Sequence, residues 1–292
     1  MSFLRKLFGS KKQDEPAPVA PAAPPHAEKV ASGSSRAQVG WVSDVGKQRT
    51  TNEDSVLVVQ ASQEGNNALP PFTLLILADG MGGHQSGEVV SALAARSMAR
   101  HIVQQVYLSA LAHRDHGAQQ PSIQETLVEG SNLANSTVNA TVPGGGTTLV
   151  CALLLGSRAY LSNVGDSRAY LVASNGLQQI SRDHSLVDRL VELGQLTAEE
   201  AASHPQKNVL YRAIGQSGVL EVDTFVHSIQ PGEGLLLCSD GLWGMMSDEQ
   251  MGQIIAAAAS PQAACEALAV AANQAGGRDN ISIVLVQFPD SS

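Results

Sequence analysis

Four aspartates stand at the ends of apolar, strand-like runs, and this feature most restricts how the chain can fold. Asp54 and Asp279 each come just before such a run, and Asp79 and Asp240 each come at or just after the end of one; the runs are Ser55–Val59, Phe72–Ala78, Leu235–Cys238 and Ile281–Phe288. Short apolar runs bounded by turn residues are typical of buried strands. A sandwich of such strands would bring the four carboxylates together at one edge.

The other apolar patterns predict several consecutive strands, with pairs of helices between these groups of strands. Helical spacing predicts helices, and period-two or continuous apolar runs predict strands. The predicted helices are Gly87–Tyr107, Ser122–Asn139, Ser185–Leu193, Thr197–Ser203, Ser247–Ala258 and Pro261–Ala275, and the further strands are Thr147–Leu155, Arg158–Val164, Ser167–Ala173 and Glu221–Ser228. This grouping favours an α+β fold with antiparallel sheets covered by helices.

The composition changes near residue 38. Residues 1–38 contain the stretch PAPVAPAAPP at Pro16–Pro25, which is typical of an extended, solvated tether. Residues 1–12 are basic and carry a few apolar side chains, so they fit either a weak anchor to a membrane surface or partner protein, or a disordered start. The folded domain is expected over residues 39–292.

Charge and cysteine content narrow the class of protein. The net charge of −9 over 292 residues repels the nucleic-acid backbone, so no nucleic-acid partner is expected. The three cysteines form no CxxC pair, and buried thiols in a reducing, cytoplasmic compartment are the simplest interpretation. No apolar run is long enough to cross a bilayer. We expect a monomer.

Clustered carboxylates point to cation chemistry. They repel one another unless a cation neutralises them. A set of oxygen ligands without histidine or cysteine favours Mg²⁺ or Mn²⁺ over Zn²⁺, and the carbonyl group of Gly80 could join it. Two such ions activate water and polarise a phosphoryl oxygen. Any single Asp-Gly after a strand is more often an ordinary turn, so the combination carries the argument.

The chain resembles the metal-dependent protein phosphatases, the PPM or type 2C family, in its bacterial form. The resemblance spans about Val39 to Phe288 and rests on motifs that occur in the family's order: Arg49-Thr-Thr-Asn-Glu-Asp54, Asp79-Gly-Met-Gly-Gly-His84, Gly146-Thr-Thr148, Gly165-Asp-Ser-Arg168, Asp183-His-Ser185, Ser239-Asp-Gly-Leu242 and Asp279-Asn280. It implies an αββα sandwich of two antiparallel sheets covered by helices, with metals in a cleft at one edge.

The resemblance also implies a set of metal ligands. Asp79 would bridge two ions of Mn²⁺ or Mg²⁺, with the carbonyl of Gly80 on one ion and Asp240 and Asp279 on the other. Glu53 and Asp54 would belong to the same shell, one directly and one through water, in an order that the sequence leaves open. Asp166 matches the position of a third, weaker metal; the alternative is a simple turn residue.

The remaining candidate residues are those that would bind the phosphate group or transfer a proton. Arg49 is the expected phosphate clamp, because a guanidinium makes paired hydrogen bonds to phosphate oxygens. Arg168 is interpreted as a structural ion-pair partner. Many eukaryotic members place a histidine where this chain has Met81, which cannot transfer a proton. His84 is a candidate general acid in its place, although a histidine at a helix start is more often structural.

The resemblance implies hydrolysis of phosphoserine and phosphothreonine in proteins, opposing a eukaryotic-like serine/threonine kinase in bacterial signalling. Residues 185–215 match the family's flap, which is either a mobile gate or a rigid insertion. Two alternatives remain: a phosphatase for one dedicated phosphorylated regulator, and a catalytically dead scaffold of the same fold. The presence of Asp54, Asp79, Asp240 and Asp279 speaks against the scaffold.

Overall fold

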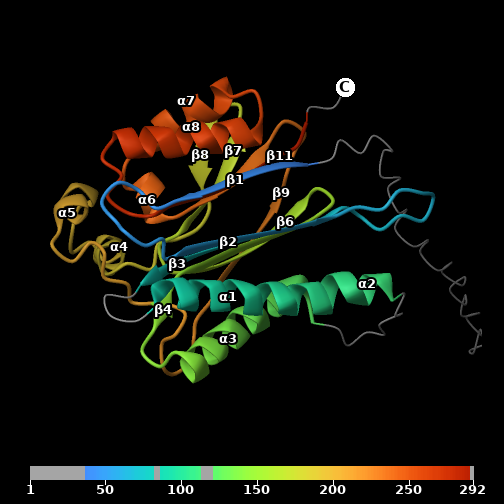
Figure 1. Ribbon diagram of the computed structural model, residues 1–292, viewed down its shortest axis with the longest axis horizontal. Coiled ribbons are helices and arrows are strands. Elements are labelled where there is room, and N and C mark those ends of the chain that lie inside the picture. The colour runs from blue at the N-terminus through green and yellow to red at the C-terminus, as the bar shows by residue number, and fades with distance from the viewer. Residues whose placement is uncertain (1–36, 82–85, 113–120, 290–292) are drawn as a thin grey trace, which may run out of the picture. The chain divides into compact units, whose positions relative to one another are not determined.

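Two antiparallel sheets stack face to face in the computed structural model, which describes residues 37–81, 86–112 and 121–289 (Figure 1). One sheet has the order β1-β11-β10-β7-β8, formed by β1 (Gln38–Asp44), β11 (Ile281–Gln287), β10 (Gly234–Cys238), β7 (Arg168–Ala173) and β8 (Gly176–Gln179). The other has the order β2-β3-β5-β6-β9, formed by β2 (Asp54–Ala61), β3 (Phe72–Met81), β5 (Leu149–Leu155), β6 (Arg158–Val164) and β9 (Asp223–Ser228), with the short β4 (Gly146–Thr147) beside β3.

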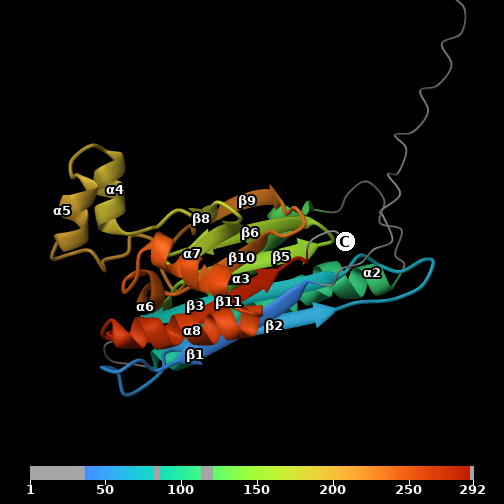
Figure 2. The ribbon, with the colours of Figure 1, turned by 90° about the horizontal axis from the view of Figure 1, so that it is seen from above.

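Helices cover the outer face of each sheet (Figure 1). The β2–β9 sheet is covered by α1 (Gly87–Ile102), a π-helical turn (Val103–Leu108), α2 (Ser109–Leu111) and α3 (Ile123–Thr141), and the β1–β8 sheet by α6 (Asp240–Trp243), α7 (Asp248–Ala257) and α8 (Pro261–Gln274). Ser122 and Ser247 each form a capping box that fixes where a helix begins. The short helices α4 (Leu186–Glu192) and α5 (Ala198–Ser203) project from one end of the sandwich (Figure 2).

Three separate apolar layers hold the four structural layers together. One layer, which includes Leu74 and Met98, lies between the β2–β9 sheet and its helices. A second, which includes Leu236 and Leu268, lies between the other sheet and its helices. The third, which includes Leu75 and Leu237, fills the space between the two sheets. Adjacent residues of β3 therefore face different layers, as the period-two geometry of a strand requires, and the predicted αββα sandwich is confirmed.

The structure corrects the predicted elements in a few places. The sequence pattern missed β1, β8 and α6, and it joined β4 to β5 across Thr148. Strand β1 is an edge strand with exposed side chains such as Trp41, so its apolar signal is weak. Strands β4 and β5 pair with β3 in the same register, and the backbone N–H of Thr148 between them donates to the carbonyl oxygen of Asp79, so the predicted single strand differs little from the two observed ones.

Several predictions lie outside the described residues. They are residues 1–36 of the tether predicted over residues 1–38, the anchor at residues 1–12, and His84. The last residue of the predicted tether, Gln38, begins β1. Within residues 37–289, as far as the structure describes them, no helix is both long and apolar enough to cross a bilayer.

Candidate active site

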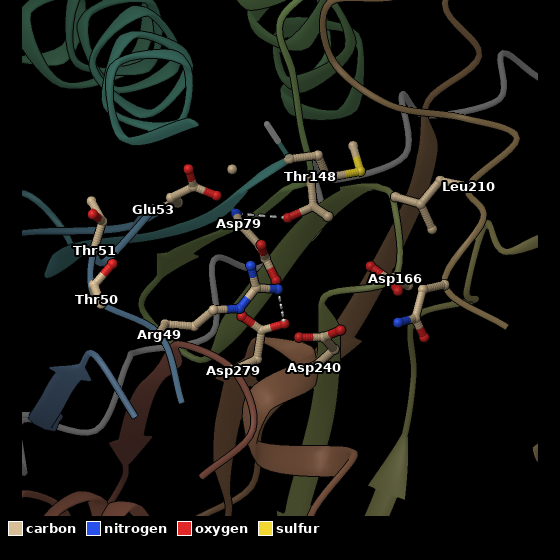
Figure 3. A pocket seen from close by; sticks show the side chains of 13 residues that line it. Arg49, Thr50, Thr51, Glu53, Asp79, Thr148, Asp166, Leu210, Asp240 and Asp279 are labelled. Carbon is tan, nitrogen blue, oxygen red and sulfur yellow. Dashed lines mark hydrogen bonds and ion pairs between the residues drawn. The ribbon is translucent and has the colours of Figure 1, made fainter. Parts of the chain in front are cut away.

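Carboxylates from both sheets converge on one pocket at the edge of the sandwich (Figure 3). Strand β3 supplies Asp79 near its C-terminal end, and the turn between β6 and β7 supplies Asp166. Asp240 is the first residue of α6, and Asp279 lies just before β11. The pocket has a volume of about 440 Å³ and is also lined by Arg49, Glu53, Gly80, Met81 and Thr148, among others. The predicted meeting of the strand ends is therefore what the structure shows.

Two threonines hold the backbone of Asp79 in place. The hydroxyl of Thr148 accepts a hydrogen bond from the N–H of Asp79 at 2.9 Å (Figure 3), and the hydroxyl of Thr147 donates to the carbonyl oxygen of Asp79 at 2.8 Å. Both threonines are buried. The Gly146-Thr-Thr148 motif, which contributes to the family resemblance, therefore orients Asp79.

Asp54 stands opposite Asp79 in the ladder between β2 and β3. Its Oδ2 accepts a hydrogen bond from the hydroxyl of Ser239 at 2.9 Å, whereas its buried Oδ1 has no hydrogen-bond partner among the described residues. Glu53, unlike Asp54, lines the pocket itself. A buried carboxylate oxygen without a donor is costly, so the position of Oδ1 is suited to a cation or to water bound by one.

Burial and mutual repulsion raise the pKa values of these carboxyl groups. Burial, opposed by hydrogen bonds from serine and reinforced by nearby carboxylates, raises the pKa of Asp54 to about 7. Burial and the charge of Asp279 raise the pKa of Asp240 to about 6. Burial, followed by the charges of Asp54 and Asp240, holds the pKa of Asp79 well above its usual range. A divalent cation would reverse the local sign and favour the ionised forms.

The acidic side chains that line the pocket suit a hard divalent cation, because the ligand atoms that they offer are carboxylate oxygens. No group of three or more histidine, cysteine, aspartate or glutamate side chains in the described ranges is already closed around a metal position. Instead the carboxylates bond to their neighbours: Asp279 to Arg49, and Asp54 to Ser239. A cation bound by these carboxylates would therefore compete with Arg49 for Asp279 and with Ser239 for Asp54.

Close backbone packing explains two of the glycines. A Cβ atom on Gly80 would lie 2.4 Å from the carbonyl oxygen of Gly87 and 2.6 Å from that of Glu53. A Cβ atom on Gly241 would lie 2.0 Å from the carbonyl oxygen of Asn280. Real Cβ atoms do not approach oxygen this closely. Glycine is therefore required after Asp79 for β3 to pass close to the backbone of Glu53 and Gly87, and after Asp240 for α6 to pack against the backbone before β11.

Asn280 fixes the loop that carries Arg49 and Glu53. Its side-chain amide donates to the carbonyl oxygens of Val45 at 3.0 Å and Thr51 at 2.9 Å, and its Oδ1 accepts from the N–H of Glu53 at 2.8 Å. The side chain is buried. Asn280 belongs to the Asp279-Asn280 motif of the family resemblance. The residues around it in the sequence do not indicate that its side chain binds a loop more than 200 residues away along the chain.

Replacing Asn280 with alanine should loosen this loop. The variant leaves two carbonyl oxygens and one N–H without their partners, and each such loss in a buried site costs roughly 1–3 kcal/mol. We expect urea unfolding to show a loss of about 2–4 kcal/mol and the kcat/KM of the phosphatase reaction that the family resemblance implies to fall about tenfold or more. Asn132→Ala, which removes one exposed bond on α3, is the matched control. Stability and activity equal to the wild type would contradict this role.

Arg49 reaches across the pocket from the loop before β2 (Figure 3). Its Nη2 donates to Oδ2 of Asp279 at 2.7 Å, and this hydrogen bond is the main reason why the pKa of Arg49 is raised. About half of the side chain is exposed. The guanidinium thus lies at the mouth of the pocket, close to the carboxylates and open to an incoming anion.

Asp166 belongs to a second network on the other side of the pocket. Its backbone carbonyl accepts a hydrogen bond from Nε1 of Trp243 at 3.1 Å, and Trp243 stacks on Arg168, whose Cζ lies 3.8 Å from the ring centroid. Arg168 forms a bidentate ion pair with the buried Asp183 at 2.8–2.9 Å. The prediction that Arg168 is a structural ion-pair partner is confirmed, and the network fixes the backbone at Asp166.

Stability should depend on the charge of Asp166. Burial, followed by the charges of Asp240 and Asp183, raises the pKa of Asp166 to about 7. Because the folded pKa is raised, the folded state binds the proton more tightly, and stability is lost as the pH rises from about 4 through about 7. In EDTA, Asp166→Asn should therefore gain in Tm over the wild type by several degrees at pH 8 and by little at pH 5. An equal difference at both pH values would contradict the assignment.

The α4–α5 segment (residues 186–209) is closed at its base. The N–H of Leu186 donates to the carbonyl oxygen of Val209 at 2.7 Å, and Ser185 and Leu210 form a β-bridge. Leu210 and Asn208 line the pocket (Leu210 is labelled in Figure 3). The predicted flap therefore borders the carboxylates, and both ends of the segment are hydrogen-bonded to each other.

Known proteins match most of the chain. The sequence profile of the family "Protein phosphatase 2C" matches residues 40–193. The serine/threonine phosphatase stp of Listeria innocua is 38% identical over 244 residues, which are 84% of this chain and 93% of the relative. The structure of the Streptococcus agalactiae serine/threonine phosphatase superposes with a TM-score of 0.70 at 31% identity, covering 87% of this chain and 100% of the other. The catalytic domain of the phosphatase PstP, solved with two manganese ions, gives a TM-score of 0.66 at 33% identity, covering 87% and 99%.

Proposed function

This chain belongs to the protein phosphatase 2C family, and we propose that the carboxylates at the sheet edge hold the cations with which it removes phosphate from phosphoserine and phosphothreonine in proteins. Its class, a metal-dependent serine/threonine protein phosphatase, follows from the family and its relatives. The assignment of individual residues is our proposal. The observation that carries it is the convergence of Asp79, Asp240 and Asp279 from separate strands on one pocket.

We assign two cations, Mn²⁺ or Mg²⁺, to this pocket. As the family resemblance implies, Asp79 would hold both ions, the carbonyl group of Gly80 would hold one of them, and Asp240 and Asp279 would hold the other. Glu53 faces the pocket, whereas Asp54 lies behind it, which favours contact through water for Asp54. Asp166 is the candidate for a third ion. The two manganese ions in the related PstP structure support the proposal of two cations.

The cations, when bound, supply a nucleophile by activating water and polarise the phosphoryl group. The chain's own residues bind and orient. Arg49 would break its hydrogen bond to Asp279 and donate two parallel hydrogen bonds from its guanidinium group to two phosphate oxygens. Thr147 and Thr148 keep Asp79 in position, and Asn280 keeps the Arg49 loop in position. Met81 lines the pocket but holds no transferable proton, so the leaving group must take its proton from another source.

The physiological setting follows by inference from the activity. A serine/threonine phosphatase acts on phosphoproteins, and we propose that a serine/threonine kinase of the same cell supplies them. Three unpaired, buried cysteines are consistent with a reducing compartment, so we propose a cytoplasmic enzyme. We further propose that it acts as a monomer.

One assay tests the proposed function. The full chain is incubated with p-nitrophenyl phosphate and with a phosphothreonine peptide in Mn²⁺, in Mg²⁺ and in EDTA. We expect both substrates to be hydrolysed with either cation, and hydrolysis to stop in EDTA and return when Mn²⁺ is restored. Activity that persists in EDTA, or no activity under any condition, would contradict the proposal; the second result would favour a scaffold.

A further inference from the structure

A second groove opens beside the catalytic pocket, between the α4–α5 segment and the core. Its volume is about 650 Å³, within the range of roughly 300–1,000 Å³ that is usual for binding sites. Asn208, Asp240 and Asp279 line both the groove and the catalytic pocket. The two spaces are therefore adjacent, and a phosphorylated residue bound in the catalytic pocket lies next to the groove.

One part of the groove is apolar and already formed. Val187 and Val191 of α4 lie on one side, and Trp243 and Met245 lie on the core side. Val187 is buried, and Trp243 is fixed by its stacking on Arg168 and by its hydrogen bond to Asp166. These side chains would offer an apolar ligand a surface that needs little rearrangement, which favours binding.

The groove also carries two cations that have no ion-pair partner among the described residues. Lys207 follows α5, Arg278 precedes β11, and both are exposed. The other charged side chains of the groove outside the metal site are engaged: Arg168 pairs with Asp183, and Asp188 accepts a hydrogen bond from Ser185. On a chain with a net charge of −9, two unpaired cations beside one groove favour an acidic ligand.

We propose that this groove binds the substrate polypeptide beside its phosphorylated residue. An apolar side chain of the substrate would pack against Val187, Val191 and Trp243, and an acidic side chain would pair with Lys207 and Arg278. Consecutive Cα atoms are about 3.8 Å apart, so residues one to three positions from the phosphorylated residue can reach the groove. The proposal rests on the proposed function and adds a substrate class: phosphopeptides with neighbouring acidic and apolar residues.

The test compares phosphothreonine peptides that differ only in their flanks, assayed with the full chain in saturating Mn²⁺. One set carries a leucine and two glutamates within three residues on either side, and the other carries serine and lysine there. We expect kcat/KM to favour the acidic, apolar set by about tenfold, since exposed ion pairs contribute roughly two- to fivefold each.

Lys207→Glu with Arg278→Glu should abolish or reverse this preference and leave p-nitrophenyl phosphate hydrolysis within about twofold. Val191→Asp should weaken the preference for leucine.

Matched variants separate the groove from general charge effects. Arg158→Glu, at the opposite end of β6 from the pocket, and Leu193→Asp, which is exposed just past α4 and does not line the groove, should keep the wild-type preference. If the wild type hydrolyses both peptide sets equally, or if the double variant keeps the preference, the groove proposal is wrong and the phosphatase assignment stands. If the wild type hydrolyses neither the peptides nor p-nitrophenyl phosphate, the proposed function is wrong as well.

Discussion

Asp240→Asn should lower kcat/KM for phosphopeptide and for p-nitrophenyl phosphate by about a thousandfold or more. An amide cannot supply the negative charge that a divalent cation requires, and bound cations contribute several kcal/mol to stabilising the transition state. The concentration of Mn²⁺ that gives half-maximal activity should also rise, and this can be measured by titration against residual turnover. Asp248→Asn, an exposed position at the start of α7, is the control and should behave as the wild type.

The same variant should be more stable than the wild type when no metal is bound. Burial and the neighbouring charge of Asp279 raise the pKa of Asp240 to about 6, so its ionised form destabilises the fold above that pH. In EDTA at pH 8 the Tm of Asp240→Asn should exceed that of the wild type, and Mn²⁺ should reverse the order. Full activity, or a lower Tm in EDTA, would show that Asp240 does not belong to a cation site.

Arg49→Ala should reduce kcat/KM by about tenfold to a hundredfold. A hydrogen bond to a charged group contributes roughly 1.5–3 kcal/mol, and Arg49 is placed to give a phosphate two of them. The loss should appear with p-nitrophenyl phosphate as well as with peptides, because both present the same phosphoryl oxygens. Steady-state kinetics in saturating Mn²⁺ measure this without interference from metal affinity.

Arg49→Lys separates charge from geometry. Lysine keeps the positive charge but lacks the planar fork, so it should restore only part of the lost kcat/KM. Arg182→Ala removes an exposed arginine that does not line the pocket and should have no effect. If Arg49→Ala changes kcat/KM by less than about twofold, or lysine restores it fully, Arg49 does not grip phosphate with paired hydrogen bonds.

The central strands could be predicted from the sequence because they are buried on both faces. Runs such as Phe72–Ala78 and Ile281–Phe288 stand out by continuous apolar character. The edge strands could not be found in the same way. Strand β8 is short and β1 is exposed at Trp41, so neither shows a clear apolar period, and both are held by pairing with distant strands.

The carboxylates of the site could be located from their place at strand ends, but their supports could not. Thr148, Ser239 and Asn280 act through hydrogen bonds to residues far away along the chain, and such partners leave no local pattern. The sequence also left open which of Glu53 and Asp54 would bind a metal directly and which through water. In the structure Glu53 lines the pocket, whereas Asp54, which pairs with Asp79 in the ladder between β2 and β3, does not.

Strand β11 has a consequence for when this enzyme becomes active during its synthesis. It is the last strand among the described residues, it is inserted between β1 and β10, and it begins two residues after Asp279. A nascent chain that still lacks residues 279–287 has no Asp279 at the pocket and lacks the strand that β1 pairs with. Phosphatase activity should therefore first appear only after these residues have left the ribosome and paired, so that translation itself delays the enzyme until the domain is whole.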